Sequence, residues 1–195
     1  YEDVLINNYA AFITIKNNIS KRLILSAGLR LDQNDYEKIN LYSPRLNIDY
    51  EVFRGKTNLI LNIGKYHQNP PGIYVANDIS KVLKSVKAIQ YSLNLEQMIT
   101  PSTKLTISGY QKNYEDSPIL PNSNLFQDPT FLFDELRMYN GIVSNGTALA
   151  EGVEVLVQKK RAENFYGLIG GSIFNSTFTD YDGIKRSRNH NYGYI

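Results

Sequence analysis

Polar and apolar residues alternate along most of this chain, and this period of two constrains its fold more than any other feature. Apolar residues occupy every second position from Leu46 to Val52, and the alternation resumes after Arg54-Gly55-Lys56, from Thr57 to Tyr66. Such alternation predicts β-strands with one apolar and one polar face. The intervening glycine predicts a tight turn, so we expect an all-β chain built from hairpins.

The same pattern predicts eight strands and the start of a ninth. The expected strands are Tyr9–Asn17, Arg22–Asp32, Ser43–Phe53, Thr57–Tyr66, Val86–Ile99, Lys104–Tyr114, Thr147–Lys159 and Asn164–Thr179, with the last beginning near Asn191. A helical period occurs only at residues 77–86, where apolar residues would share one face after an Asp N-cap. This segment could belong to a partly helical lid over residues 68–84, or to a loop stiffened by its two prolines.

Short and longer connectors alternate between these strands. The short ones are Asn18–Lys21, Arg54–Lys56, Thr100–Thr103 and Lys160–Glu163, and the longer ones are Gln33–Tyr42, His67–Ser85, Asp116–Gly146 and Tyr181–His190. In an up-and-down meander, alternate connectors lie at opposite ends, so all short turns should share one end. Outer-membrane barrels have this asymmetry, with short periplasmic turns and longer extracellular loops.

The two faces of the expected strands suit two different solvents. One face carries leucine, isoleucine, valine and tyrosine, whereas the other carries Arg45, Asn47 and Asp49 in the Ser43–Phe53 strand. A dry protein core would not accept these charges, but a water-filled lumen would. The expected fold is therefore an antiparallel up-and-down meander of about eight to nine strands, part of a transmembrane β-barrel. The alternative is an antiparallel sheet with one face on a soluble core and one in water.

Composition excludes several classes of function for the 195 residues. The net charge of +2 gives no reason to expect nucleic-acid binding, and the absence of cysteine excludes disulfides and thiolate metal sites. The two histidines, His67 and His190, lie far apart without ligand-like spacing, so we expect neither a metal site nor a cofactor. No Gly-x-Ser-x-Gly motif is present and neighbouring carboxylates fall at strand ends, so we expect no enzymatic activity.

Several longer motifs, taken in order, resemble the barrel domain of TonB-dependent outer-membrane receptors. "LSAGLRLDQNDYE", "YSPRLNIDYEV" and "TNLILNIGKYHQNPP" resemble that family's Gly-Leu-Arg strand, its Ser-Pro-Arg strand start and its Gly-x-Tyr-x-Gln-x-Pro strand end. "LEQMITPSTKLTISGYQKNYEDSPIL" resembles the following hairpin, and "EGVEVLVQKKRAENFYGLIGGS" resembles its Gly-(Val/Ile)-Glu and Tyr-Gly strands. The resemblance covers nearly the whole chain.

This resemblance implies a receptor that binds a scarce nutrient, such as a siderophore, cobalamin, a glycan or a peptide, in the bacterial outer membrane. The complete protein would hold a plug domain inside a larger barrel and would be driven by TonB through that plug. Residues 1–195 would then form a partial barrel domain without the plug, since both ends read like strand sequence. Isolated from its neighbours, such a segment is expected to oligomerise through its strand edges and apolar face.

Two groups of residues are candidates for function. Substrate contacts are expected where strands pass into longer connectors, at Tyr66, His67, Gln68, Tyr114 and Asp116, although an interfacial aromatic girdle is an alternative there. Arg30, Arg45, Asp49 and Glu154 should face the lumen, where they would contact the plug or the substrate, or belong to an ion-pair and hydrogen-bond network that braces the barrel wall to the plug. A competing hypothesis is a complete eight-stranded barrel with a structural or small-ligand-binding role, which requires the first and last strands to pair.

Overall fold

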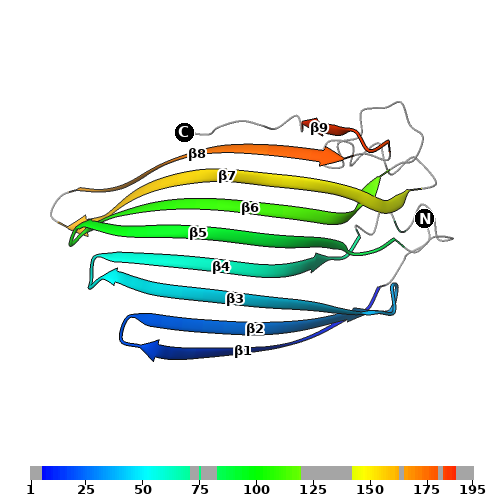
Figure 1. Ribbon diagram of the computed structural model, residues 1–195, viewed down its shortest axis with the longest axis horizontal. Helices are drawn as coiled ribbons and strands as arrows, with labels where there is room; N and C mark the ends of the chain where they lie inside the picture. Colours follow the sequence, from blue (N-terminus) through cyan, green and yellow to red (C-terminus); the bar gives the residue numbers. More distant parts are fainter. Residues whose placement is uncertain are drawn as a thin grey trace.

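The computed structural model of this chain is a single antiparallel sheet of nine strands that follow one another in chain order (Figure 1). It describes residues 6–70, 75, 83–119, 142–162, 165–179 and 182–187. The strands are β1 (Asn8–Ser20), β2 (Leu23–Asn34), β3 (Asn40–Phe53), β4 (Thr57–Gln68), β5 (Val86–Thr100), β6 (Thr103–Ile119), β7 (Val143–Ala162), β8 (Phe165–Thr179) and β9 (Lys185–Ser187). The predicted all-β meander is thus confirmed.

The connectors divide between the two ends of the sheet as the sequence predicts. Residues 21–22, 54–56, 101–102 and 163–164 join strands at one end, which we call the short-turn end. Residues 35–39, 69–85, 120–142 and 180–184 join strands at the other end, which we call the mouth. Since every strand runs antiparallel to the next, no connector has to cross the sheet.

Several sequence-based boundaries differ from the structure; β6, for example, ends at Ile119 rather than Tyr114, and β7 begins at Val143 rather than Thr147. The connector expected at Gln33–Tyr42 is shorter in the structure and comprises residues 35–39. The polar ends of β2 and β3 remain paired as far as Gln33 and Asn40. The ninth strand lies at Lys185–Ser187, earlier than expected, and Asn191 is outside the described residues. Most of the expected helix and lid, residues 76–82, also falls outside them, but Val86 starts β5 and is not helical.

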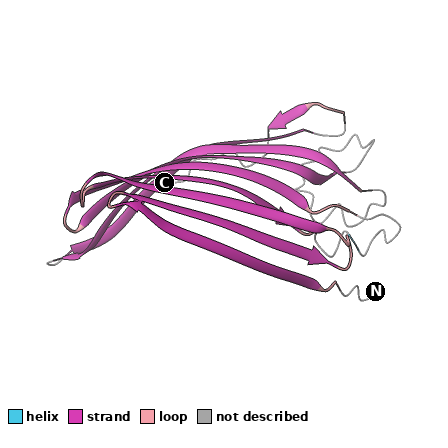
Figure 2. Cartoon of the chain, turned by 60° about the horizontal axis from the view of Figure 1, so that its bottom comes forward, coloured by secondary structure: helices cyan, strands magenta, loops and turns pink. Residues whose placement is uncertain are grey.

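The sheet is bent and twisted, so it has a convex and a concave face (Figure 2). Exposure alternates with the pleat: in β5 the apolar residues Tyr91, Leu93 and Leu95 are exposed, whereas Ser92, Asn94 and Glu96 between them are partly covered. Side chains on a concave surface shield one another, and those on a convex surface spread apart. The apolar face is therefore convex and the polar face concave, as a barrel wall requires.

The apolar band on the convex face runs obliquely to the strands. One cross-strand row, from β2 to β8, is entirely free of polar side chains: Leu25, Ile48, Leu61, Leu93, Gly109, Val153 and Ile173. The next row toward the mouth is apolar from Ala27 on β2 to Tyr91 on β5, but continues as Gln111, Glu151 and Asn175. Strands in barrels are tilted relative to the membrane plane. The residues that meet the hydrocarbon layer therefore lie at shifted positions from one strand to the next.

Close packing is concentrated at the mouth. Every buried hydrophobic residue of the described part lies in a mouth connector or in the mouth half of a strand: Leu41, Val75, Leu83, Ile119, Ile142, Ala148 and Phe178. The middle of the sheet has no such core, and its large apolar side chains, such as Ile13 and Ile173, are exposed.

The sheet is open at both edges. Among the described strands, β1 pairs only with β2 and β9 only with β8. The hypothesis of a complete eight-stranded barrel required the first and last strands to pair, and this pairing is not found. None of the described residues forms a helix with the length and hydropathy of a membrane-spanning segment.

Candidate functional site

Tyr66, His67 and Gln68 form the mouth end of β4, where the sequence predicted ligand contacts. The Tyr66 ring lies under the guanidinium of Arg45, 4.7 Å from ring centroid to Cζ. His67 Nδ1 is 3.0 Å from Oγ of Ser43, which is buried on β3. Gln68 is the exposed last residue of the strand. Tyr66 and His67 are therefore held in fixed positions, whereas the Gln68 side chain is exposed.

Tyr114 and Asp116 lie near the mouth end of β6, two strands from the first group. The register of β6 against β7 is interrupted between Tyr114 and Ser117, and Asp116 has a φ of 57°. A bulge of this kind re-aims side chains next to functional sites. It brings Asp116 Oδ1 within 3.7 Å of Lys84 Nζ, in the connector that precedes β5.

The start of β5 joins the two predicted groups. Lys87 pairs with His67 on one side and with Glu115 on the other in the strand ladder. Its ammonium also forms an ion pair with the Glu115 carboxylate. The structure therefore places residues 66–68 and 114–116 along one rim, with Lys87 between them, a residue that the sequence analysis did not single out.

A polar network beside this rim was also missed. Both carboxylate oxygens of Glu37 accept hydrogen bonds from Ser85, one from the backbone N–H at 2.6 Å and the other from the hydroxyl. Asn34 donates to Glu37 and to Asn69 at 3.3 Å each, and Asn69 in turn donates to Asn8 at 2.5 Å. Asn34 and Ser85 are buried. Glu37, Asn69 and Ser85 lie in mouth connectors, and residue spacing gives no link between these positions and Asn8.

Three successive backbone N–H groups at the end of the 69–85 connector are held by side chains of other elements. Leu83 donates to the Tyr36 hydroxyl at 2.7 Å, Lys84 to Ser144 Oγ at 3.0 Å, and Ser85 to Glu37. Tyr36 and Glu37 precede β3, whereas Ser144 lies on β7. The connector end therefore touches both the early and the late strands at the mouth and fixes their relative positions.

The four residues predicted to face the lumen lie on the concave face, but among the described residues only Arg30 of the four has an ion-pair partner. Arg30 binds Asp32 on its own strand, with Nη2 2.7 Å from Oδ1 and Nε 2.9 Å from both oxygens. Arg45, Asp49 and Glu154 form no ion pair or hydrogen bond through their side chains within the described part of the chain. Hydrogen bonds between neighbouring strands on this face are made by other polar residues.

Those other residues form a hydrogen-bonded row across the concave face. Asn47 donates to Asn62 at 2.6 Å, and Asn62 donates to Ser92 at 3.1 Å, which links β3, β4 and β5. Nearer the short-turn end, Lys104 and Glu96 form an ion pair of 2.9 Å. Such a row is compatible with water on this face.

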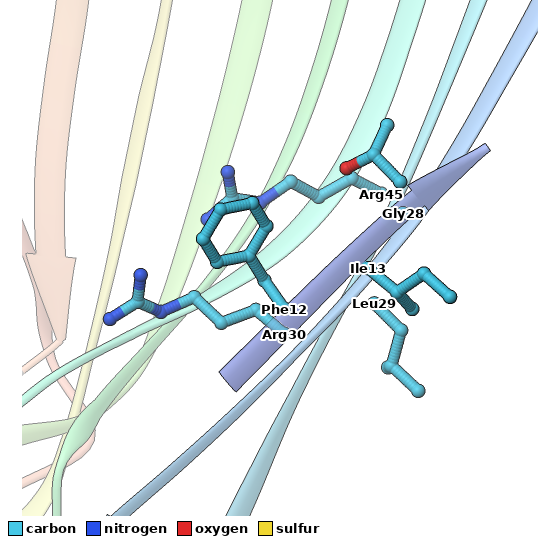
Figure 3. A pocket seen from close by; sticks show the side chains of 7 residues that line it. Phe12, Ile13, Gly28, Leu29, Arg30 and Arg45 are labelled. Atoms are coloured by element: carbon cyan, nitrogen blue, oxygen red, sulfur yellow. The ribbon is translucent and has the colours of Figure 1, made fainter. Parts of the chain in front are cut away.

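Two shallow hollows lie on the concave face near Gly28. The first has a volume of about 190 Å³ and is lined by Phe12, Thr14, Gly28, Arg30 and Arg45, together with Ile13 and Leu29 at its edge. Figure 3 shows Phe12, Arg30 and Arg45 on one side of the sheet and Ile13 and Leu29 on the other. The second, of about 200 Å³, shares Gly28 and Arg45 and includes Asn47, Asn62 and Tyr66. The Arg45 guanidinium beside the Tyr66 ring could meet an anionic group here, whereas the Arg30 guanidinium is already bound to Asp32.

Metal ligation has no support in the described residues, where no three His, Asp or Glu side chains lie close enough together to hold an ion. His190, the second histidine, lies outside the described residues.

Solved structures with the same fold are outer-membrane transport proteins. The ferric-catecholate import receptor Fiu of Escherichia coli K12 matches with a TM-score of 0.69 and 14% identity, over 92% of this chain and 30% of its own. The iron transporter FrpB of Neisseria meningitidis matches with 0.68 and 13%, over 92% and 27%. The alcaligin receptor FauA of Bordetella pertussis matches with 0.63 and 16%, over 95% and 32%. This chain thus spans at most about a third of each.

Sequence comparison gives the family directly. No protein with a curated description matches the chain. The family model described as "TonB dependent receptor-like, beta-barrel" matches residues 1–194. Together with the two-faced, tilted meander and the division of its connectors, this match identifies the chain as a member of the TonB-dependent receptor β-barrel family.

Proposed function

We propose that this chain is a wall segment of an outer-membrane receptor that imports a scarce nutrient with energy delivered by TonB. The supporting observation is the oblique apolar band on the convex face, set against a polar concave face. Large side chains such as Ile13, Ile169 and Ile173 gain burial only from hydrocarbon or from further protein. A plug domain and further strands would come from the rest of the receptor.

The proposed ligand contacts are the mouth residues Tyr66, His67, Gln68, Tyr114 and Asp116. Their aromatic, amide and charged groups suit a polar ligand of moderate size. The structural relatives named as importers of ferric catecholate and as a receptor of alcaligin support a ferric chelate as the first ligand to test. Cobalamin, glycans and peptides are the other candidates.

A topology experiment tests the membrane part of the proposal. An epitope is inserted into the connector between β6 and β7 of the full-length receptor, and in a second version into the turn at residues 101–102. Antibody should label the first version on intact cells and the second only after the outer membrane is opened. Labelling of both on intact cells, or recovery of the receptor outside the outer-membrane fraction, would contradict the proposal.

An uptake experiment tests the transport part. Cells that depend on this receptor for iron should accumulate radioactive iron from a ferric chelate when TonB is present and lose that uptake when TonB is deleted. Replacement of Gln68 and Asp116 by alanine should weaken chelate binding without loss of the receptor from the membrane. Matched substitutions of Ser102 and Thr103 at the short-turn end should leave binding unchanged.

A further inference from the structure

Three of the four short turns carry positive charges without partners in the described part of the chain. The side chains concerned are Lys21, Arg22, Arg54, Lys56, Lys159 and Lys160, which we call the basic rim. Lys159 is partly exposed and the other five are exposed. Within the described residues, none of the six forms an ion pair or a side-chain hydrogen bond. The turns lie at the short-turn end, on the left of Figure 1, so these charges share one edge of the wall.

The carboxylates near these turns are engaged elsewhere or lie further away. Glu51 Oε1 accepts a hydrogen bond from the backbone N–H of Gly55 at 2.7 Å. Glu96 forms its 2.9 Å ion pair with Lys104, which does not belong to the basic rim. Asp49 lies further from the turn on β3 than Glu51 does. The described residues therefore leave the positive charge of the basic rim without neutralising partners.

The charges at the mouth, in contrast, are largely paired. Asp35 and Glu37 add negative charge there and accept hydrogen bonds from neighbouring residues. Three cations of the mouth form ion pairs: Lys84 with Asp116, Lys87 with Glu115 and Arg186 with Asp182. Because the net charge of the whole chain is only +2, the positive excess is a property of the short-turn end.

Each turn of the basic rim also has a large apolar side chain exposed beside its cations. Ile19 lies just before the first turn and is 54% exposed, and Phe53 directly precedes Arg54 and is 65% exposed. Phe165 is 66% exposed, and its ring centroid lies 5.9 Å from the Lys159 ammonium. Long cationic side chains beside apolar groups suit the boundary of a bilayer, where the stem meets apolar surface and the charge meets the headgroups.

The spacing of the turns suits several ligands rather than one. The β1–β2 and β3–β4 turns are two strand spacings apart, which is about 10 Å. Six strand spacings, about 29 Å, separate the β1–β2 turn from the β7–β8 turn. A single small anion cannot reach all three cationic turns, whereas neighbouring lipid headgroups in one leaflet can.

We infer that the basic rim binds phospholipid headgroups of net negative charge in the leaflet that meets the short-turn end. Each cationic turn contacts its own headgroups, and Ile19, Phe53 and Phe165 enter the adjoining acyl region. Lysine and arginine side chains near a membrane surface are attracted to anionic lipids. The exposed apolar side chains favour lipid over a soluble acidic protein, because lipid supplies both an anionic and an apolar partner. The inference rests on the proposed function, which places the convex face in a bilayer.

Lipid photo-cross-linking of the full-length receptor tests the inference. The receptor is placed in phosphatidylcholine vesicles that contain a small fraction of photo-reactive phosphatidylglycerol or, for comparison, of photo-reactive phosphatidylcholine. Labelled peptides are then identified by mass spectrometry. Peptides that contain the β3–β4 and β7–β8 turns should capture phosphatidylglycerol about five-fold more than phosphatidylcholine, the excess expected for one cation at an anionic surface. High salt should reduce this excess.

Variants show whether the basic rim causes the excess. Arg54→Gln with Lys56→Gln should abolish it at the β3–β4 turn and leave it intact at the β7–β8 turn. Arg54→Lys with Lys56→Arg should retain it at both turns. Lys38→Gln with Lys185→Gln removes the same number of charges from exposed residues at the mouth, and this matched control should change nothing at the turns.

Equal capture of the two lipids at the turns, or an excess that persists in Arg54→Gln with Lys56→Gln, would overturn the inference. In living cells, a photo-reactive amino acid at Ser102, in the turn between the cationic ones, should capture phospholipid. Capture of a soluble acidic protein there instead would also overturn it. Peptides around Leu93 on the convex face report on the bilayer itself. If they capture neither lipid, the proposed function fails, whereas equal labelling of Leu93 by both lipids without an excess at the turns contradicts only this inference.

Discussion

Tyrosine is the dominant aromatic residue of the chain, with 15 copies beside 8 phenylalanines and no tryptophan. On the concave face its role is specific, because Tyr66 and Tyr110 each cover a glycine and carry a cation on the ring. A ring over a strand glycine restores the packing that the missing side chain would have supplied. The hydroxyl keeps the same ring compatible with water, which phenylalanine would not do.

Gly152 should tolerate a side chain less well than Gly109. A Cβ at Gly152 would meet the Ile173 carbonyl oxygen at 2.8 Å, a backbone atom that cannot easily move, whereas nothing lies within 4 Å of a Cβ at Gly109 on the convex face. Gly152→Ala should lower the free energy of unfolding by about 1–3 kcal/mol, in the range of overpacked sites. Gly109→Ala is the matched control and should be neutral. Urea unfolding of the receptor in lipid vesicles measures both, and equal effects would contradict the structure.

Asp182 should remain ionised at unusually low pH. It lies outside the spanning strands, and its pKa falls from 3.8 to about 2 because Arg186 binds its carboxylate and the Ile184 backbone N–H donates to it. A lowered pKa means that ionised Asp182 stabilises this turn above pH 3.8, and the contribution disappears as pH falls through about 2. A titration of ¹³C-labelled aspartate carboxyl groups should show one midpoint near 2. Asp182→Asn should remove that signal and so assign it to Asp182. A midpoint near 3.8 for the Asp182 carboxyl group would contradict the prediction.

Within one strand, the two faces should respond oppositely to a new charge. Leu93 lies in the apolar row of the convex face, and its neighbour Asn94 lies on the concave face between Asp49 and Glu154. Leu93→Lys places an ammonium group in hydrocarbon and should destabilise the barrel by about 2–4 kcal/mol. Asn94→Lys should be tolerated. The folded fraction in vesicles, read from gel mobility without heating, compares the two, and equal tolerance would exclude a bilayer on the convex face.

Glu37 should control the order of the connector before β5. It accepts both hydrogen bonds from Ser85, and removal of its carboxylate leaves the buried groups of Ser85 and Asn34 without that partner. Glu37→Ala should therefore make local opening easier by about 1–3 kcal/mol. Hydrogen exchange at the Ser85 amide should accelerate, while Glu51→Ala, at the short-turn end, should leave it unchanged. An unchanged Ser85 rate in Glu37→Ala would contradict this role.

The existence and order of the strands could be predicted from sequence, but the contacts at the mouth could not. Periodicity depends on neighbouring residues, so every strand from β1 to β8 was found with small errors at its ends. The network of Asn8, Asn34, Glu37, Asn69 and Ser85 joins residues far apart in sequence through the ladder register, and periodicity contains no information about register across a long connector. Polar strand ends such as Asn34 and Asn40 were assigned to loops because propensity ignores the partner strand.

At the scale of the whole molecule, the sequence predicted the faces correctly but not the pairing of charges. Arg30, Arg45, Asp49 and Glu154 were all placed on the polar face, and Arg30 with Asp32 shows the expected ion pair. The Tyr110 and Lys112 stack was missed, although a strand glycine opposite a tyrosine was a usable signal. Within the described residues, Arg45, Asp49 and Glu154 have no ion-pair partner, which the sequence did not predict.

The two edges of the sheet supply the last prediction, because the proposed function requires them to pair with further strands of a larger barrel. In the full-length receptor, β1 and the β8–β9 edge should each pair with other strands, so cysteines at Ala11 and Ile173 should not form a disulfide. Cysteines at Ala11 and Leu31, direct partners on β1 and β2, are the positive control. The isolated segment should behave differently, since nothing covers its edges: without detergent it should scatter light as oligomers, and with detergent its size should fall. A stable monomer in plain buffer, or a disulfide between Ala11 and Ile173 in the receptor, would show that this sheet closes on itself and needs neither membrane nor further strands.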